Sequence, residues 1–291
     1  MPTLWSHRAV LLLAGSLLLA PVLRAQCSDC LVPSSDGPTV LSPSRGEASA
    51  PERARAQAGD ATAVSISSWS APGSTINTPT AYGAEWGQVF AGVSYQHRIR
   101  YSDWHDGILV VGVGAGNPRR TVGLSATVSI LDTYTEFAKD RSLSLKLHRQ
   151  LPLRSAVAVG YENVWRTRGT DGGASRYAVA STVLPLRDDP TGPLGALVLS
   201  AGLGDDRFLS EPRFARGERG VNAFGSLGLR LLRPLSGIVN WSGQDLNLGL
   251  SVVPVRGAPV VVTPALLDVT GRAGDGARVA IAASVRYDAR P

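Results

Sequence analysis

The sequence predicts an all-β protein: a closed antiparallel up-and-down membrane β-barrel of about 12 strands, preceded by a disordered N-terminal tether. Three observations carry this prediction. Glycine is abundant, with 32 among 291 residues, and methionine occurs once, a composition that in strand-like sequence favours an all-β protein. Short runs of alternating apolar and small polar residues recur from Trp86 to the end of the chain. The connections between these runs alternate between short and long.

Residues 1–25 have the features of a secretory signal peptide. Arg8 precedes the apolar run AVLLLAGSLLLAPVL, and small residues lead to a cleavage site after Ala25. The run is shorter than the about 20 residues that a membrane-spanning helix needs. An uncleaved N-terminal anchor is the alternative. Because no later stretch is long and apolar enough to form such a helix, we expect an exported protein without one.

Residues 26–80 are expected to form a disordered periplasmic linker. Proline, serine, alanine and charged residues dominate there without periodicity, so little apolar surface is available to offset chain entropy. A short ordered piece at Ser65–Trp69 is the alternative. Cys27 and Cys30 lack the further ligands of a zinc site, the folded surroundings of a redox motif and the preceding small residue of a lipidation signal. We therefore interpret them as a local disulfide.

The barrel is expected to span residues 81–291 and to contain twelve strands. Seven runs alternate regularly: 86–101, 120–130, 142–148, 196–204, 226–232, 246–252 and 278–287. Five are less regular: 107–115, 155–165, 175–184, 236–242 and 259–268. Most approach the roughly 9–11 residues that a tilted transmembrane strand requires.

The connections favour an outer-membrane barrel, which has short periplasmic turns and long outer loops. GNPR, QLPL, RPLS and VRGA are tight turns, and between them fall LDTYTEFAKD, TRGTDGG, GDDRFLSEPRFARGERGVN and DVTGRAGDG. LRDDPTGPLG is an exception, because it takes the place of a short turn. Outer-membrane barrels also carry aromatic girdles. The candidates are Tyr95, Tyr101, Tyr161, Trp165, Tyr177 and Tyr287.

The two faces of the strands differ in a way that favours a membrane barrel. One face is mostly leucine and valine, and the other is mostly glycine and serine. Solvent-exposed faces of soluble sheets more often carry large polar side chains, whereas small residues fit the concave interior of a barrel. We therefore expect the apolar face to contact lipid and the small polar face to line the lumen. A soluble secreted β-sandwich or β-barrel that binds a ligand or partner is the alternative.

The region from Tyr82 to Tyr287 resembles bacterial outer-membrane β-barrels. TPTAYGAEWGQVFAGVSYQHRIRYS, followed by DGILVVGVGAGNP, also resembles an uncharacterised group of predicted barrel proteins found in cyanobacteria and other bacteria. This second resemblance is most specific over residues 78–118. It implies an architecture, but no activity and no catalytic residues.

Charged residues divide unequally between the two faces. Alternation assigns eight cationic or titratable basic residues to a lumen-facing cationic wall: Arg98, Arg100, Lys146, His148, Arg176, Arg230, Arg278 and Arg286. Glu162 is the acid on that face. Such a wall favours anions, which predicts a small passive channel with anion preference, or else a structural surface protein. The alternative is that these cations bind lipid phosphates or pair with loop acids such as Asp205 and Asp206.

The sequence predicts no enzyme, although an outer-membrane lipid-modifying enzyme remains an alternative. Ser94 and His97 lie on opposite faces of one strand, so they cannot form a nucleophile–base pair. Asp103, His105 and Asp106 are too loosely arranged for a metal, and GVGAGN lacks the rest of a phosphate-binding loop. We expect no cofactor, no metal and, despite the net charge of +6, no nucleic acid. The expected partners are outer-membrane lipid, the barrel-assembly machinery and small anionic solutes.

Overall fold

The computed structural model describes residues 71–98, 100, 103, 105–131, 133, 138–167, 173–255 and 257–290. The expected signal peptide, the ordered piece at Ser65–Trp69 and the disulfide between Cys27 and Cys30 lie outside these residues.

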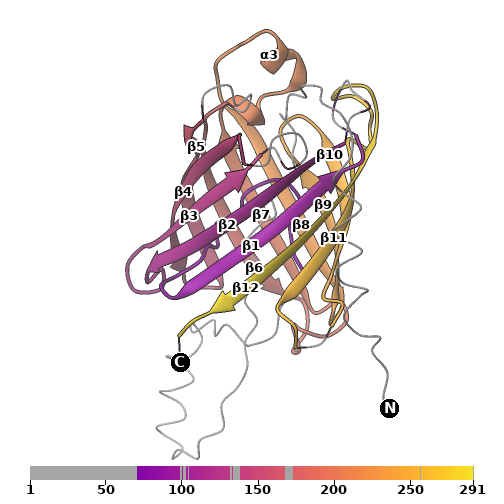
Figure 1. Cartoon of the computed structure of the whole chain (residues 1–291). Helices are drawn as coiled ribbons and strands as arrows, with labels where there is room; N and C mark the ends of the chain where they lie inside the picture. Colours follow the sequence, from indigo (N-terminus) through magenta and orange to yellow (C-terminus); the bar gives the residue numbers. More distant parts are fainter. Residues whose placement is uncertain are drawn as a thin grey trace, which may run out of the picture.

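Twelve antiparallel strands form one closed barrel (Figure 1). Each strand pairs with its neighbours in the chain, and β1 pairs with β12 to close the sheet. The strands are β1 (Gln88–Gln96), β2 (Asp106–Gly116), β3 (Gly123–Ile130), β4 (Arg141–Leu151), β5 (Ser155–Arg166), β6 (Ser175–Pro185), β7 (Ala196–Gly204), β8 (Asn222–Leu232), β9 (Leu235–Trp241), β10 (Leu246–Val252), β11 (Val260–Leu267) and β12 (Arg278–Asp288). Each of the twelve runs expected from the sequence coincides with one strand, so the all-β barrel fold is confirmed.

The two ends of the barrel carry different connections. β1 begins and β12 ends at the lower end in Figure 1, where the tight turns also lie, together with the longer connection 186–195. The upper end carries the long loops, including η1 (Asp206–Phe208) and α3 (Glu211–Ala215), which rises above the rim. The connection 242–245 is short although it lies at the upper end. No helix in the described part of the chain is long and apolar enough to cross a membrane.

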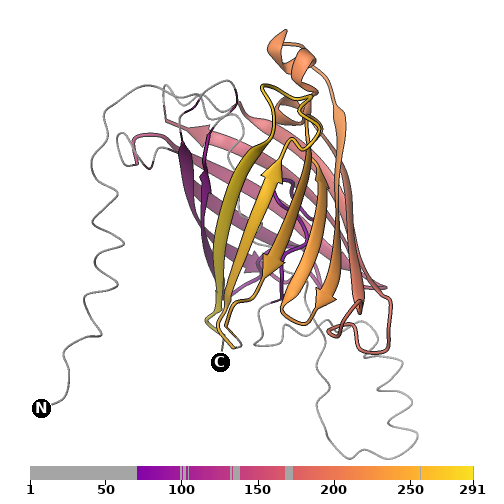
Figure 2. The same cartoon turned by 90° about the vertical axis from the view of Figure 1, so that its right-hand side faces the viewer.

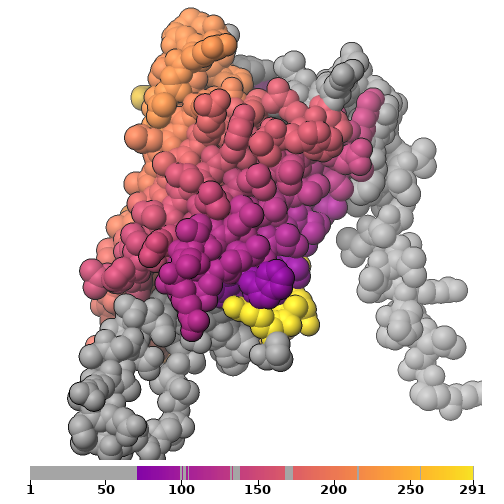
Figure 3. Space-filling model, turned by 90° about the vertical axis from the view of Figure 1, so that its left-hand side faces the viewer, coloured from indigo at the N-terminus to yellow at the C-terminus, as the bar shows by residue number. Residues whose placement is uncertain are grey.

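The outer surface of the barrel is apolar, and many polar side chains lie in its interior. Valine, leucine and isoleucine side chains on all sides of the barrel are exposed, among them Val93, Leu147, Val159 and Ile281. The side chains that are almost fully buried include many polar ones: Gln88, Gln96, His148, Asn240, Asn247 and Arg278. The face shown in Figure 3 is a continuous wall of strand side chains. In soluble proteins, valine, leucine and isoleucine are among the side chains that are most often fully buried.

Residues 71–85 occupy the interior, and we call residues 71–87, which end at the lower rim, the inner segment. Thr80, Ala81 and Ala84 in it are completely shielded from solvent. The linker was expected to continue to residue 80, and that boundary is wrong, because residues 71–80 already lie inside the barrel. The sequence does not reveal this, since a segment that runs through a polar interior needs no apolar periodicity of its own.

The inner segment follows a U-shaped path, part of which is visible in Figure 2 as the indigo coil between the strands. Gly73 lies beside the lower half of β10, and Asn77 lies beside its upper end. The chain then descends, so that Ala84 lies beside the lower half of β3, and it continues directly into β1. One continuous stretch therefore fills the lumen and forms the first strand.

Small residues on the inner wall make room for the inner segment. A Cβ atom added to Gly114 of β2 would lie 2.3 Å from the carbonyl carbon of Ala84. One added to Gly228 of β8 would lie 2.7 Å from the Cα of Ser74. At Gly249 of β10, the same atom would lie 3.0 Å from Ile76. The small polar face predicted from the sequence thus accommodates a second layer of backbone.

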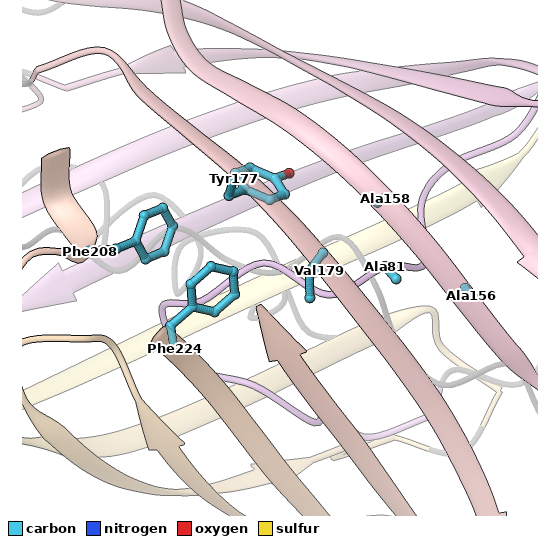
Figure 4. Close-up of a cluster of buried hydrophobic side chains, with 7 residues drawn as sticks. All are labelled: Ala81, Ala156, Ala158, Tyr177, Val179, Phe208 and Phe224. Carbon is cyan, nitrogen blue, oxygen red and sulfur yellow. The ribbon is translucent and has the colours of Figure 1, made fainter. Parts of the chain in front are cut away.

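An aromatic cluster fills the upper part of the barrel between the wall and the inner segment (Figure 4). The rings of Phe208 and Phe224 stack with centroids 4.4 Å apart, and Tyr177 meets both rings edge-on. Ala81 of the inner segment belongs to the same cluster. Tyr177 therefore faces the interior, and its expected place in the outer aromatic girdle is wrong.

Candidate functional site

In the lower half of the lumen, Lys146 and His148 of β4 contact backbone oxygens of the inner segment. Lys146 Nζ donates to the carbonyl oxygens of Tyr82 (2.5 Å) and Thr80 (3.4 Å). His148 Nε2 lies 3.1 Å from the carbonyl oxygen of Ala84. Both side chains face the interior, as alternation predicts, and both are nearly buried. In these contacts they hold the inner segment in place.

Uncharged side chains of the wall add further contacts to the inner segment. Ala81 N donates to Ser181 Oγ at 2.8 Å, and Ala84 N donates to Ser125 Oγ at 3.0 Å. Asn240 Nδ2 donates to Thr78 Oγ1 at 2.6 Å. The sequence gives no signal for these pairs, because they join residues from 41 to 162 positions apart.

Ser125 and His148 form a contact that sequence reasoning missed. The two residues lie on neighbouring strands, and Ser125 Oγ is 3.4 Å from His148 Nε2. A carbonyl oxygen only accepts hydrogen bonds, so Nε2 carries the proton in its shorter contact with Ala84. A protonated Nε2 cannot act as a base toward Ser125. The contact therefore anchors the inner segment and is not a nucleophile–base pair.

Asp245 is the centre of an ion-pair cluster at the upper end of the barrel. Its Oδ2 atom accepts from Arg100 Nη2 at 3.4 Å and from Arg278 Nη2 at 3.3 Å. Glu211 of α3 also pairs with Arg100. Closure of the sheet between its first and last strands predicts that Arg100 and Arg278 are neighbours, and the structure brings them to one carboxylate. All four residues come from loops or strand ends that are distant in sequence.

The remaining basic residues of the expected wall are dispersed. Arg98 lies beyond the end of β1 at the upper rim, where it pairs with Asp275 at 2.5 Å. Arg230 and Arg286 face the interior nearer the lower end, on β8 and β12. The expected residues therefore form no continuous cationic wall. Those at the upper end pair with loop acids, although these are not the suggested Asp205 and Asp206.

Arg176 does not face the lumen. It is exposed on the outer face of β6, where its guanidinium lies 5.5 Å from the ring centroid of Tyr161. The expectation for Arg176 is thus wrong, for the same reason as that for Tyr177. In β6 the small Ala178 and Ala180 point outward and the larger Val179 points inward, so side-chain size misleads the assignment of faces.

Glu162 faces the interior, as expected, and pairs with Arg207 of η1. Arg207 Nη2 donates to Glu162 Oε1 at 2.8 Å, and Arg207 Nη1 donates to the carbonyl oxygen of Asn77 at 3.0 Å. The same loop inserts Phe208 into the aromatic cluster. The long upper loop therefore folds partly into the barrel and fastens the turn of the inner segment.

Asp206, next to Arg207, is a carboxyl group in an unfavourable position. Partial burial is the main factor that raises its pKa above the usual value, and the charge of the neighbouring Asp205 adds to the effect, whereas a hydrogen bond from Ser175 opposes it. The φ angle of Asp206 is +48°, a left-handed conformation that few residue types adopt easily.

These contacts define a closed β-barrel with an internally filled lumen. No protein-family model matches the chain, and no curated protein is significantly similar to it. Among the described residues, no group of three or more histidine, cysteine, aspartate or glutamate side chains is arranged to hold a metal ion.

Proposed function

We propose that this chain is an integral outer-membrane β-barrel, closed by its own inner segment and acting as a structural surface protein. The distribution of side chains carries the proposal: apolar side chains cover the outside of the barrel, and many polar ones are buried inside it, beside the aromatic cluster. Monomeric soluble proteins rarely expose an apolar patch larger than a few hundred Å². A lipid environment removes the cost of that exposure, as it does for transmembrane barrels.

The two rims of the barrel support the same proposal. Exposed aromatic side chains lie near both ends: Trp165 and Trp241 near the upper end, and Trp86 and Tyr287 near the lower. Aromatic side chains are enriched at both membrane interfaces of such barrels. The charged residues on the outer face of the described strands, Arg141, Arg149 and Arg176, also lie toward the strand ends. There their long side chains reach lipid head-group phosphates.

Membrane extraction and gel migration test this assignment. Cells expressing the chain are fractionated, and the membranes are washed with sodium carbonate. We expect the protein to stay in the outer-membrane pellet and to migrate faster on gels before boiling than after it. A mature protein that is freely soluble would overturn the proposal and support a soluble secreted barrel. The β-sandwich alternative is excluded by the closed sheet.

A second candidate function is a passive channel with anion preference that opens when the inner segment leaves the lumen. Lys146 and His148 support this function. Both are basic side chains on the inner wall, and in the closed barrel they contact backbone oxygens of the inner segment. Withdrawal of that segment would expose basic side chains along the lumen, which favours small anionic solutes. The occupied lumen argues that the intact chain is closed at rest.

Conductance in planar bilayers distinguishes the two candidates. We expect little conductance from the full chain. If the channel function is correct, a variant lacking residues 71–84 conducts and prefers anions in a salt gradient, and Lys146→Met reduces that preference. A deletion variant that folds but does not conduct, or that prefers cations, would contradict the channel and leave the structural role.

The proposal involves no catalysis. Ser125 and His148 are almost fully buried and lie against the inner segment, which leaves a lipid substrate no access to them. Unchanged lipid composition in cells that carry Ser125→Ala would argue against a lipid-modifying enzyme. Membrane lipid and the barrel-assembly machinery remain the proposed partners. The resemblance of residues 78–118 to a group of predicted barrels stays a prediction.

A further inference from the structure

We infer that the lower half of the lumen binds a small inorganic anion at Arg230 of β8. Arg230 is only 5% exposed, and its Nη1 atom donates to the carbonyl oxygen of Arg233 at 3.2 Å. Its Nε atom has no hydrogen-bond partner in the part of the chain that the structure describes. No ion pair between the described residues includes it, because the nearby Asp189 pairs instead with Arg233 at 2.7 Å.

Arg230 differs in this respect from Arg100, Arg207 and Arg278, the buried or partly buried arginines in the upper half of the barrel. Arg100 and Arg278 share Asp245, and Arg207 pairs with Glu162. A buried charge is strongly unfavourable unless it is paired. Arginine cannot relieve this cost by losing its proton, since its guanidinium stays protonated in proteins. A counterion that is not part of the chain resolves the imbalance.

A buried hydroxyl group of the inner segment points to the same ligand. Gly228 precedes Arg230 by two residues on the inner face of β8, and Ser74 of the inner segment lies against Gly228. The Oγ atom of Ser74 is buried and has no hydrogen-bond partner among the residues that the structure describes. Buried polar groups in folded proteins are almost always hydrogen-bonded. Hydroxyl and guanidinium groups can all donate, which matches an anion such as chloride.

The anion would also contribute to the closed state of the barrel. Ser74 belongs to the inner segment, whereas Arg230 belongs to the wall. An anion bound to both would fasten the start of the inner segment to β8. This inference holds for a barrel in any surroundings and does not depend on the proposed membrane location.

Thermal unfolding in different sodium salts tests the site. The full chain is purified in detergent, and its unfolding is followed by circular dichroism as chloride replaces gluconate at constant ionic strength. We expect chloride to raise the midpoint by about 2–4 °C, as a ligand specific to the folded state does. Arg230→Gln should abolish this rise. Its midpoint in gluconate should equal or exceed that of the wild type, because the unpaired charge is gone.

Arg233→Gln is the matched control, since Arg233 lies at the same end of the barrel but is exposed. It should keep the full response to chloride. Crystals of the unaltered chain soaked in sodium bromide give an independent measurement that does not require a variant to fold. A bromide peak within hydrogen-bonding distance of the Arg230 guanidinium supports the site. Equal midpoints in both salts, or only water beside Arg230, would overturn it.

Discussion

Arg278 and Asp245 form an ion pair of 3.3 Å at the upper end of the barrel, and both side chains are almost completely buried. Arg278 begins the last strand, and Asp245 lies in the short connection between β9 and β10. Arg100, from the connection after the first strand, reaches the same Oδ2 atom. One carboxylate therefore contacts two arginines near the closure between β1 and β12, and Glu211 provides Arg100 with a second acid.

Asp245→Ala should destabilise the folded protein by about 3–5 kcal/mol, because it leaves two buried guanidinium groups without this acid. The free energy of unfolding is measured by urea titration of the protein in detergent. Asp275→Ala is the control, since it removes the more exposed partner of Arg98 and should cost about 0–1 kcal/mol. Equal losses of unfolding free energy in the two variants would show that Asp245 contributes no more to stability than a more exposed acid does.

Gly114→Ala should disturb the inner segment. The added Cβ would lie 2.3 Å from the backbone of Ala84, so the segment must move, at a cost of about 1–3 kcal/mol. Limited proteolysis of the folded protein should then cut within residues 71–87. Gly237→Ala is the control, because the nearest atom to its new Cβ is 3.4 Å away. If Gly114→Ala resists the protease as well as the wild type does, the absence of a side chain at position 114 is not what makes room for the inner segment.

Phe208→Ala should remove the aromatic plug from the upper end of the barrel. Phe208 is fully buried and stacks on Phe224, so its loss should cost about 3–5 kcal/mol. The midpoint of urea unfolding, followed by tryptophan fluorescence, reports the change. Phe214→Ala, in the partly buried α3 of the same loop, should cost clearly less. A smaller effect at Phe208 than at Phe214 would contradict the packing described for the cluster.

Asp206→Asn should stabilise the protein at neutral pH. The raised pKa of Asp206 means that folding favours its neutral carboxyl form. Its contribution to stability is therefore complete below the usual carboxyl pKa and is lost as the pH rises through the raised value. Asparagine is neutral at every pH and tolerates the positive φ.

Urea unfolding at several pH values gives the measurement for Asp206. The variant should exceed the wild type at about pH 7 and match it at about pH 3, where the carboxyl is neutral in both states. A variant that is less stable than the wild type at neutral pH would show that the hydrogen bond from Ser175 outweighs the cost of burial.

The strands were predictable because each one carries its own local pattern. The run over residues 142–148 alternates apolar and polar residues, and the structure places Lys146 and His148 on the buried face accordingly. β6 was harder, because the small Ala178 and Ala180 lie on its outer face and the larger Tyr177 and Val179 lie on its inner face. Gly160 on the neighbouring strand β5 decides which face of β6 is buried. It leaves room for the Tyr177 ring, because a Cβ atom added to Gly160 would lie 2.2 Å from that ring.

The sequence by itself determined the number of strands, their order along the chain and most of their inward and outward positions. These follow from a two-residue period and from turn chemistry, which act over a few neighbouring residues. Only the tertiary structure decided what fills the lumen and which acid meets each cation. Those contacts join residues as far apart as Gly73 and Ser251, separated by 178 positions, and no local period encodes such a pairing.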